Sequence, residues 1–162
     1  MVSQSTDNKH TGDQHLPKDS KARLRLWINL LRASRFIEAE VRNRLRREFD
    51  VTLPRFDVMA ALYRQPTGMM MSQISRHLMV SNGNVTGIVD RLVKDGLALR
   101  SQRDGDRRTW IICLTINGTT TFEKMAAAHE QWVDELLQDF SADEADELQQ
   151  TLARLNSDWE NI

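Results

Sequence analysis

Arginine residues surround a short glycine-containing turn between two segments in which apolar and polar residues alternate. The turn runs from Asp104 to Arg108. An arginine at the tip of a β-hairpin can enter a narrow DNA minor groove, where the negative electrostatic potential is enhanced. An aspartate in this turn would repel DNA unless it paired with a neighbouring arginine and oriented it. The candidate DNA-binding residues of this region are Arg103, Asp106, Arg107 and Arg108.

Polar side chains and two glycines share one side of a second segment, residues 82–94. Apolar residues recur there at i, i+3, i+4 and i+7, from Val85 to Leu92, which is typical of a helix with one buried face. Gly83 and Gly87 each cost a helix roughly 1 kcal/mol relative to alanine, and close approach of the backbone to DNA would explain them. The alternative is that the start of this segment is only a loop. The candidate DNA-binding residues here are Ser81, Asn82, Asn84, Thr86 and Arg91.

Two short helices must position these side chains. The apolar pattern predicts one helix over residues 71–79 and another over 82–94, joined by a tight link with Ser81 as the N-cap. Helices of this size, joined in this way, are typical of a helix-turn-helix. Alternation predicts strands over residues 97–103 and 109–114, on either side of the arginine turn. A helix-turn-helix followed by a β-hairpin with a basic tip is a winged helix.

Longer helices are predicted on either side of the winged helix. Apolar residues recur at helical spacing over residues 21–49, over 54–64 and from 115 to about 140. A capping box at Ser141 begins a last helix, whose apolar residues are three and four positions apart, as in a coiled coil. Residues 1–20 show no periodic spacing of apolar residues, which predicts a disordered polar tail. The expected fold is mainly α, with a small β-hairpin wing and long helices at both ends.

The charges are distributed unevenly along the chain. The 162 residues contain 22 Lys and Arg against 23 Asp and Glu, a net charge of −1. Residues 1–114 hold 20 of the basic and 12 of the acidic residues, a balance of +8, whereas residues 115–162 hold 2 and 11, a balance of −9. This separation favours one part that faces a polyanion and another that stays away from it. The alternative is a set of ordinary solvated helix faces.

The sequence lacks the features of several other classes of protein. No apolar run approaches the roughly 18 residues that a membrane span needs, and the first 20 residues have no apolar stretch like that of a secretory signal. The single cysteine, Cys113, excludes a disulfide framework and fits a reducing cytoplasm. No motif of an enzyme is present, so no catalytic residue is expected. His77 and His129 are isolated, so neither a metal site nor a cofactor is expected.

The order of elements and several short motifs resemble the MarR family of ligand-responsive transcriptional regulators. The resemblance spans about residues 22–160. Its motifs are residues 78–92, Gly96-Leu97, Asp106 to Arg108 and Leu114-Thr115. The sequence departs from the family at Met69 to Met71, where a Ser or Thr cap is common. It also departs at Ile116 to Gly118, where the fifth helix usually opens differently.

The resemblance implies a homodimer that binds a pseudo-palindromic operator in double-stranded DNA. Arg108 would enter the minor groove, and Asp106 would buttress it. The N- and C-terminal helices of two subunits would interlock, which suits an acidic C-terminal segment held away from DNA. The implied organisation is one MarR-like domain over residues 21–162, with a winged helix over 53–114 and dimerisation helices over 21–49 and 115–162.

Family members commonly respond to small aromatic acids, oxidants or metals. Oxidant sensing is disfavoured, because the only cysteine lies in a predicted strand, where a small buried apolar residue is expected. An anionic ligand is favoured by the many arginines of the first helix, since arginine binds carboxylates and phosphates through paired N–H donors. The alternative is that these arginines form a solvated or phosphate-facing surface. The candidate ligand-binding residues are Trp27, Arg35, Arg42, Met59, Tyr63 and Trp132.

The predicted function is that of a homodimeric DNA-binding repressor. Residues 53–57 and 79–86 look most like the branch of the family that responds to hydroxycinnamoyl-CoA thioesters and related aromatic acids. Such a ligand would release the operator by favouring another spacing of the two recognition helices, which must lie about 34 Å apart to meet successive major grooves. The alternative is a winged-helix module that binds protein without reading DNA. Strong salt dependence of DNA binding would favour the repressor.

Overall fold

The structure, a computed structural model, describes residues 18–78, 82–103 and 106–156. Residues up to Phe36 and residues from Ile37 onward form two units, and each is described by itself. Helix α1 (Lys18–Phe49) begins three residues before the predicted boundary, so residues 18–20 are helical rather than part of a tail. Asp19 lies in the first turn, where a negative charge interacts favourably with the helix dipole.

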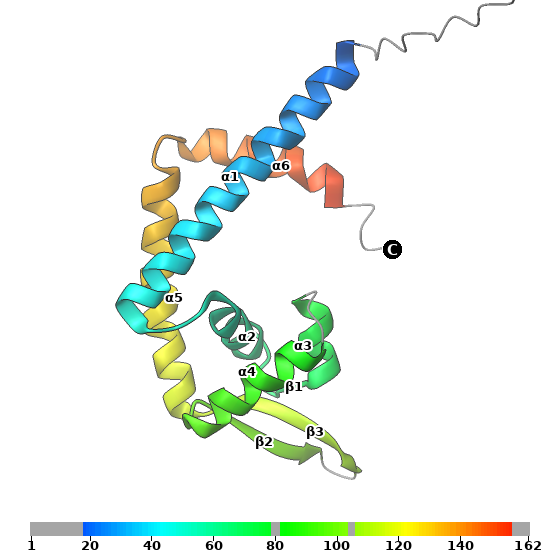
Figure 1. The fold of residues 1–162 in the computed structure, drawn as a ribbon, viewed down its shortest axis with the longest axis vertical. Coiled ribbons are helices and arrows are strands. Elements are labelled where there is room, and N and C mark those ends of the chain that lie inside the picture. The colour runs from blue at the N-terminus through cyan, green and yellow to red at the C-terminus, as the bar shows by residue number, and fades with distance from the viewer. Residues whose placement is uncertain (1–17, 79–81, 104–105, 157–162) are drawn as a thin grey trace, which may run out of the picture. The chain divides into compact units, whose positions relative to one another are not determined.

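The helix-turn-helix and the wing follow α1 in the predicted order (Figure 1). Helix α2 (Leu53–Tyr63) has Pro54 in its first turn, where the fixed φ of proline suits a helix start. Helices α3 (Met71–His77) and α4 (Asn82–Lys94) come next. Helix α4 ends before Gly96, whose φ of +69° is the left-handed conformation that a helix C-terminus commonly needs.

The wing belongs to a three-stranded antiparallel sheet, one strand more than predicted. Strand β1 (Met69–Met70) pairs with β3 (Asp106–Leu114), which also pairs with β2 (Ala98–Arg103), in the order β1-β3-β2. The sequence did not reveal β1, because a pair of residues shows no alternation. Gly68, with a φ of +88°, turns the chain so that Met69 lies opposite Ile112.

Strand β3 begins at Asp106, three residues before the predicted Thr109. The sequence suggests that residues 106–108 belong to the turn, but the structure places them in a strand. The pairing of Arg103 with Asp106, after a shift in register at Gln102, extends the ladder to the end of the hairpin. The sequence does not predict this pairing, because the residues are of types common in turns. Backbone hydrogen bonding across a hairpin depends instead on the partner strand.

The start of α3 is capped by a glutamine in place of the expected Ser or Thr. The backbone N–H of Met70 donates to Oε1 of Gln73 over 2.8 Å. This bond satisfies one backbone donor at the helix start, where N–H groups have no partner inside the helix. In place of a Ser or Thr cap, α3 therefore has the glutamine half of a capping box, while its N-cap residue, Met70, makes no side-chain cap hydrogen bond.

The core lies between α2, α4, α5 and the sheet. Helix α4 contributes Val85, Val89 and Leu92, all fully buried, which confirms the predicted inner face. Ile88 is only half-buried and borders two cavities described below. The other fully buried large side chains are Leu45, Val58, Met59, Leu62, Ile74, Ile112 and Met125.

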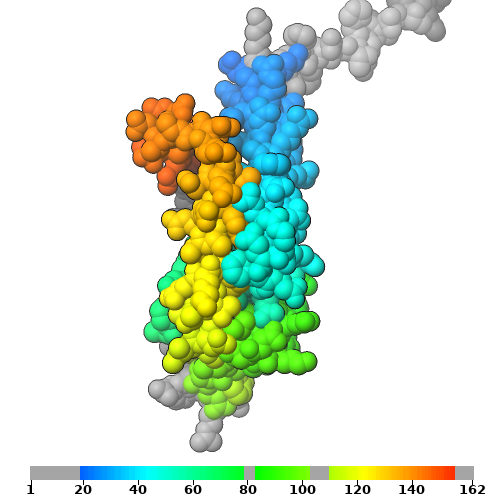
Figure 2. Space-filling model, turned by 90° about the vertical axis from the view of Figure 1, so that its left-hand side faces the viewer, coloured from blue at the N-terminus to red at the C-terminus, as the bar shows by residue number. Residues whose placement is uncertain are grey.

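Two helices complete the described chain, α5 (Ile116–Leu137) and α6 (Ala142–Asn156). Figure 2 shows α5, in yellow, side by side with the later part of α1, in cyan. Arg44 and Glu135 form an ion pair between them at 2.6 Å. The predicted capping box of α6 is confirmed, since the N–H of Ser141 donates to Glu144 over 2.9 Å. Bonds from Ser141 hold the pKa of the Glu144 carboxyl below its usual value.

Candidate nucleic-acid interface

The face of α4 opposite the core is exposed. Asn84, Thr86 and Arg91 lie on it, as predicted, together with Gly83 and Gly87. A Cβ added at either glycine would meet no described atom within 4 Å. Packing within the described chain therefore does not require glycine at these two positions, although each lowers helix stability.

For several predicted DNA contacts the structure describes only the backbone or nothing at all. Ser81 precedes the first described residue of α4. For five others the structure describes the backbone alone. Asn82 lies at the start of α4, and the other four lie in the wing strands: Arg103, Asp106, Arg107 and Arg108. The roles assigned to their side chains stay predictions.

Two ion pairs hold the C-terminal half of α4. Arg55 of α2 binds Asp95, just after α4, at 2.6 Å, and its side chain is only 17% exposed. Arg100 of β2 binds Asp90 of α4. Sequence analysis missed both pairs, because their partners lie on different elements and no local spacing connects them. Helix α4 is therefore tied to α2 on one side and to the wing on the other.

The junction between the wing and α5 is also closely connected. The N–H of Thr115 donates to the carbonyl oxygen of Leu97 over 3.0 Å, and its hydroxyl donates to the carbonyl oxygen of Gly96 over 2.7 Å. The same hydroxyl accepts the N–H of Gly118 over 2.9 Å and so caps α5. One threonine thus joins the end of α4, the wing and the start of α5.

An open groove runs along α4, with a volume of about 490 Å³. We call it the α4 groove. It has Arg55 at one border and Arg91 on the helix itself, so two guanidinium groups lie beside the glycine face. Its lining residues are Asp50, Thr52, Arg55, Gly83, Asn84, Gly87, Ile88 and Arg91.

A second cavity, of about 480 Å³, lies between the later part of α1, the start of α2 and α4. We call it the α1–α2 cavity. It shares Thr52, Asn84 and Ile88 with the α4 groove, so the recognition helix borders both spaces. Its lining residues are Arg42, Arg46, Thr52, Leu53, Pro54, Asp57, Leu78, Asn84 and Ile88.

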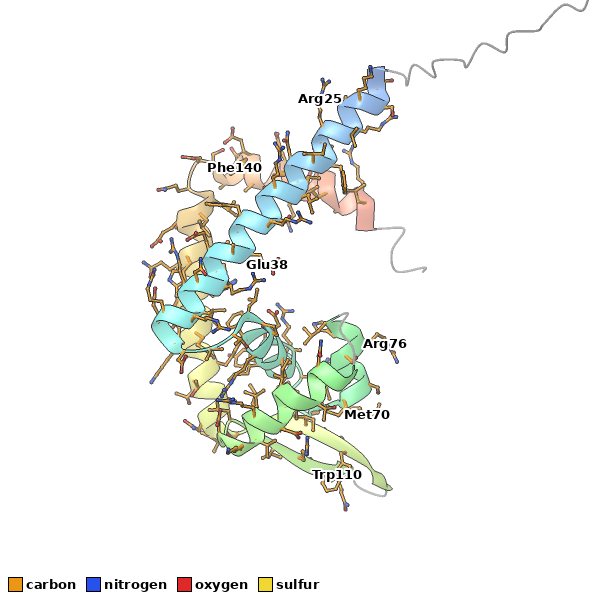
Figure 3. All side chains as sticks on the ribbon, viewed as in Figure 1. Arg25, Glu38, Met70, Arg76, Trp110 and Phe140 are labelled. Carbon is orange, nitrogen blue, oxygen red and sulfur yellow. The ribbon has the colours of Figure 1, made fainter. Side chains whose placement is uncertain are left out.

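The α1–α2 cavity combines two arginines with one carboxylate. Burial raises the pKa of the Asp57 carboxyl above its usual value, and the negative charge of Glu38 raises it further. Glu38 lies on the side of α1 that faces α2 (Figure 3) and also pairs with Arg42. The cavity therefore offers arginine donors to an anion, although Glu38 already pairs with Arg42 and Asp57 adds a carboxyl that is protonated more readily than usual.

The four predicted ligand-binding residues after Phe36 lie in three different places. Only Arg42 lines the α1–α2 cavity. Met59 is fully buried and Trp132 is 4% exposed, so both fill the core and are unavailable to a ligand. Tyr63 donates to Glu123 over 3.2 Å at a separate cavity beside α5. The remaining two, Trp27 and Arg35, are exposed in the unit that ends at Phe36.

The isolated histidine and cysteine take part in packing. The ring of His129 stacks on Phe56, with centroids 5.0 Å apart, and burial lowers the pKa of the imidazole. Cys113 is half-buried in β3. Within the described ranges, no group of three or more potential metal ligands occurs and no helix is long and apolar enough to cross a membrane.

The exposed polar face of α4 and the adjoining β-hairpin define a winged helix-turn-helix protein, a class that places the second helix of the motif in the DNA major groove. A sequence profile of the MarR family matches residues 51–110. The transcriptional activatory protein BadR of Rhodopseudomonas palustris is 31% identical over 143 residues, which cover 85% of this chain and 76% of BadR. The HTH-type transcriptional regulator PecS of Dickeya dadantii is 31% identical over 110 residues, 67% of this chain and 66% of PecS.

Solved structures agree with the sequence matches. A MarR family transcriptional regulator from Silicibacter pomeroyi is 32% identical, with a TM-score of 0.73 over 88% of this chain and 99% of that one. A mutant MarR from E. coli, complexed with operator DNA, has the same fold at 22% identity and a TM-score of 0.70, covering 83% and 95%. The chain belongs to the MarR family of winged helix-turn-helix transcriptional regulators, and these relatives are regulators rather than enzymes.

Proposed function

We propose that this protein is a homodimeric repressor that binds a pseudo-palindromic operator and releases it on binding a small anionic aromatic ligand or its CoA thioester. The observation that carries the proposal is the exposed glycine-containing face of α4, where no packing within the described chain requires glycine. The E. coli relative with this fold was solved with operator DNA. Residues 53–114 would form the DNA-binding part, and 21–49 and 115–162 the dimerisation helices.

An apolar groove between α5 and α6 supports the dimer. It has a volume of about 780 Å³, and Leu137, Phe140 and Leu148 are exposed along it. Figure 3 places Phe140 at the corner between the two helices. Exposed apolar side chains gathered in this way are commonly covered by a partner. The first half of α1 is basic and α6 is acidic, so helices of two subunits would also attract each other.

The α1–α2 cavity is the proposed ligand site. Arg42 and Arg46 supply donors for a carboxylate or phosphate, and Leu53 and Ile88 supply apolar contacts. Because Asn84 and Ile88 belong to α4, a ligand in this cavity would contact the recognition helix directly. Release of DNA requires that this contact be stronger in one spacing of the recognition helices than in the other, so that the ligand binds the two states with different affinities.

Asp57→Asn is expected to bind an anionic ligand about three- to tenfold more tightly at neutral pH, because a negative charge beside Arg42 and Arg46 is removed. In the wild type the affinity should rise as the pH falls toward the raised pKa of Asp57, because protonation of the carboxylate removes the same negative charge. The variant should lack this rise. Titration calorimetry with hydroxycinnamate and its CoA thioester measures both effects.

Asp139→Asn is the matched control, because Asp139 is exposed after the end of α5 and lines neither cavity that borders α4. It removes the same charge and should leave both the affinity and its pH dependence unchanged. Equal affinities in wild type and Asp57→Asn would place the ligand elsewhere.

Arg108→Ala is expected to weaken operator binding roughly tenfold without changing the mass of the dimer, because one minor-groove contact is lost. The measurement is binding to DNA from upstream of the chain's own gene at two salt concentrations, with light scattering for the dimer. Adding hydroxycinnamate or its CoA thioester to the same assay tests release.

Unchanged affinity in Arg108→Ala would contradict the assignment of the wing. Selective binding that neither compound affects would remove the proposed ligand but retain the regulator. Absence of selective binding at low salt would instead favour a winged-helix module that binds protein. A transcription assay on the same DNA decides the sign of regulation, because BadR is named as an activatory protein.

A further inference from the structure

Asp90 places a negative charge on the exposed side of the recognition helix. It follows Thr86 by four residues and Gly87 by three, so all three share one face of α4. Its side chain is 54% exposed. If this face meets DNA, as the proposed function requires, an unpaired carboxylate would lie among phosphates and oppose binding.

Arg100 neutralises this carboxylate from the wing. Its guanidinium pairs with Asp90, and its side chain is 38% exposed. The backbone of Arg100 lies in β2, directly opposite Ile112, which is fully buried. The arginine therefore projects from a strand anchored in the core, whereas Asp90 belongs to the helix that faces DNA.

We propose that Arg100 is a positioning residue for DNA binding, which cancels the charge of Asp90 and fixes the wing against the recognition helix. This inference rests on the proposed function, because it requires α4 and the wing to meet DNA together. Strand β2 continues from Arg100 to Arg103 at the end of the hairpin. One ion pair thus connects the helix proposed to read the major groove with the hairpin proposed to enter the minor groove.

The physical reason for a large effect on binding is the change in surroundings when DNA arrives. A partly exposed ion pair in water contributes little to folding stability, because water screens both charges. Against DNA the pair loses water and lies close to phosphates, so an Asp90 carboxylate without its partner becomes unfavourable. The loss of Arg100 should therefore weaken DNA binding far more than it weakens the fold.

A double-mutant cycle with Arg100→Gln and Asp90→Asn tests the proposal, using DNA from upstream of the chain's own gene. Arg100→Gln alone should weaken binding about 30-fold, because Asp90 is left unpaired. Asp90→Asn alone should tighten binding about twofold, since it removes negative charge. The double variant should bind within about threefold of the wild type, because no unpaired carboxylate remains.

A different pattern would overturn the proposal. If Arg100→Gln weakens binding equally with and without Asp90→Asn, and reduces the slope of log K against log salt by about 1, Arg100 contacts a phosphate directly. If Arg100→Gln lowers the melting temperature and the double variant restores neither melting nor binding, the arginine is only structural. If the wild type shows no selective DNA binding, the proposed function fails and this inference fails with it.

Arg47→Gln is the matched control. Arg47 lies on α1 and forms an exposed ion pair with Glu48 at 2.8 Å. The substitution removes the same charge and breaks another exposed ion pair, which joins two neighbours on α1, and Arg47 lines neither cavity that borders α4. It should change DNA affinity less than twofold, so a 30-fold loss in Arg100→Gln cannot be attributed to net charge alone.

Discussion

Replacing Gly83 and Gly87 together by alanine is expected to make the protein more stable and, at the same time, a weaker binder of DNA. Alanine is favoured over glycine inside a helix by roughly 1 kcal/mol at each position. Neither added Cβ would meet a described atom within 4 Å, so we expect a gain of about 1 to 2 kcal/mol, most of it at Gly87, since Gly83 is only the second residue of α4. The same methyl groups would stand between the backbone of α4 and DNA, and we expect the affinity for the operator to fall about 100-fold.

Stability and DNA affinity are expected to change in opposite directions, so a loss of affinity in this variant cannot be explained by unfolding. Urea denaturation measures the free energy of unfolding, and a DNA-binding titration measures affinity on the same preparation. Thr120→Ala serves as the control, because Thr120 is exposed on α5 and alanine there raises helix propensity without altering α4. If the glycine variant binds DNA as tightly as the wild type, this face of α4 does not meet DNA.

Gly118→Ala is expected to lower the free energy of unfolding by about 3 kcal/mol or more. An added Cβ would overlap the carbonyl oxygen of Leu97 and lie 2.8 Å from the carbonyl carbon. These are backbone atoms, so no flexible side chain can move aside. Leu97 is itself held by Leu92 and Thr115 through backbone hydrogen bonds of 2.9 and 3.0 Å. The start of α5 would have to shift away from the wing.

The comparison of single glycine substitutions makes the second prediction specific. Gly83→Ala makes the same substitution at a position where the added Cβ would meet no described atom within 4 Å, and it should stabilise the protein. Urea denaturation should show a higher free energy of unfolding for Gly83→Ala and a lower one for Gly118→Ala, with a similar dependence on urea concentration in both. A loss below about 0.5 kcal/mol in Gly118→Ala would mean that α5 does not pack closely on Leu97.

Local patterns in the sequence predicted the recognition helix well. The spacing of Val85, Val89 and Leu92 identified the buried face of α4, and the structure buries all three. The spacing of Ser141 and Glu144 identified the start of α6, and the structure shows the capping bonds. Both features depend on residues within a few positions of one another, so helical geometry alone connects sequence and structure.

The proposed ligand site could not be predicted in the same way. The apolar character of Met59 and Trp132 suggests the lining of a ligand pocket, but both side chains pack into the core. An apolar helix face shows that it is covered, not whether protein or ligand covers it. The structure instead brings Arg42 and Arg46 of α1 together with Asp57 of α2 and Ile88 of α4. No local spacing relates these four residues.

The sequence by itself determined the order of the helices, the inner face of α4 and the basic character of the wing, because these follow from periodicity and residue type. Only the tertiary structure decided that β1 joins the sheet, that β3 begins at Asp106 and that Arg100 pairs with Asp90. Strand pairing and ion pairs between elements depend on which segments meet in space. Residues far apart along the chain become neighbours only when their helices and strands pack around a common core, and no local pattern in the sequence describes that packing.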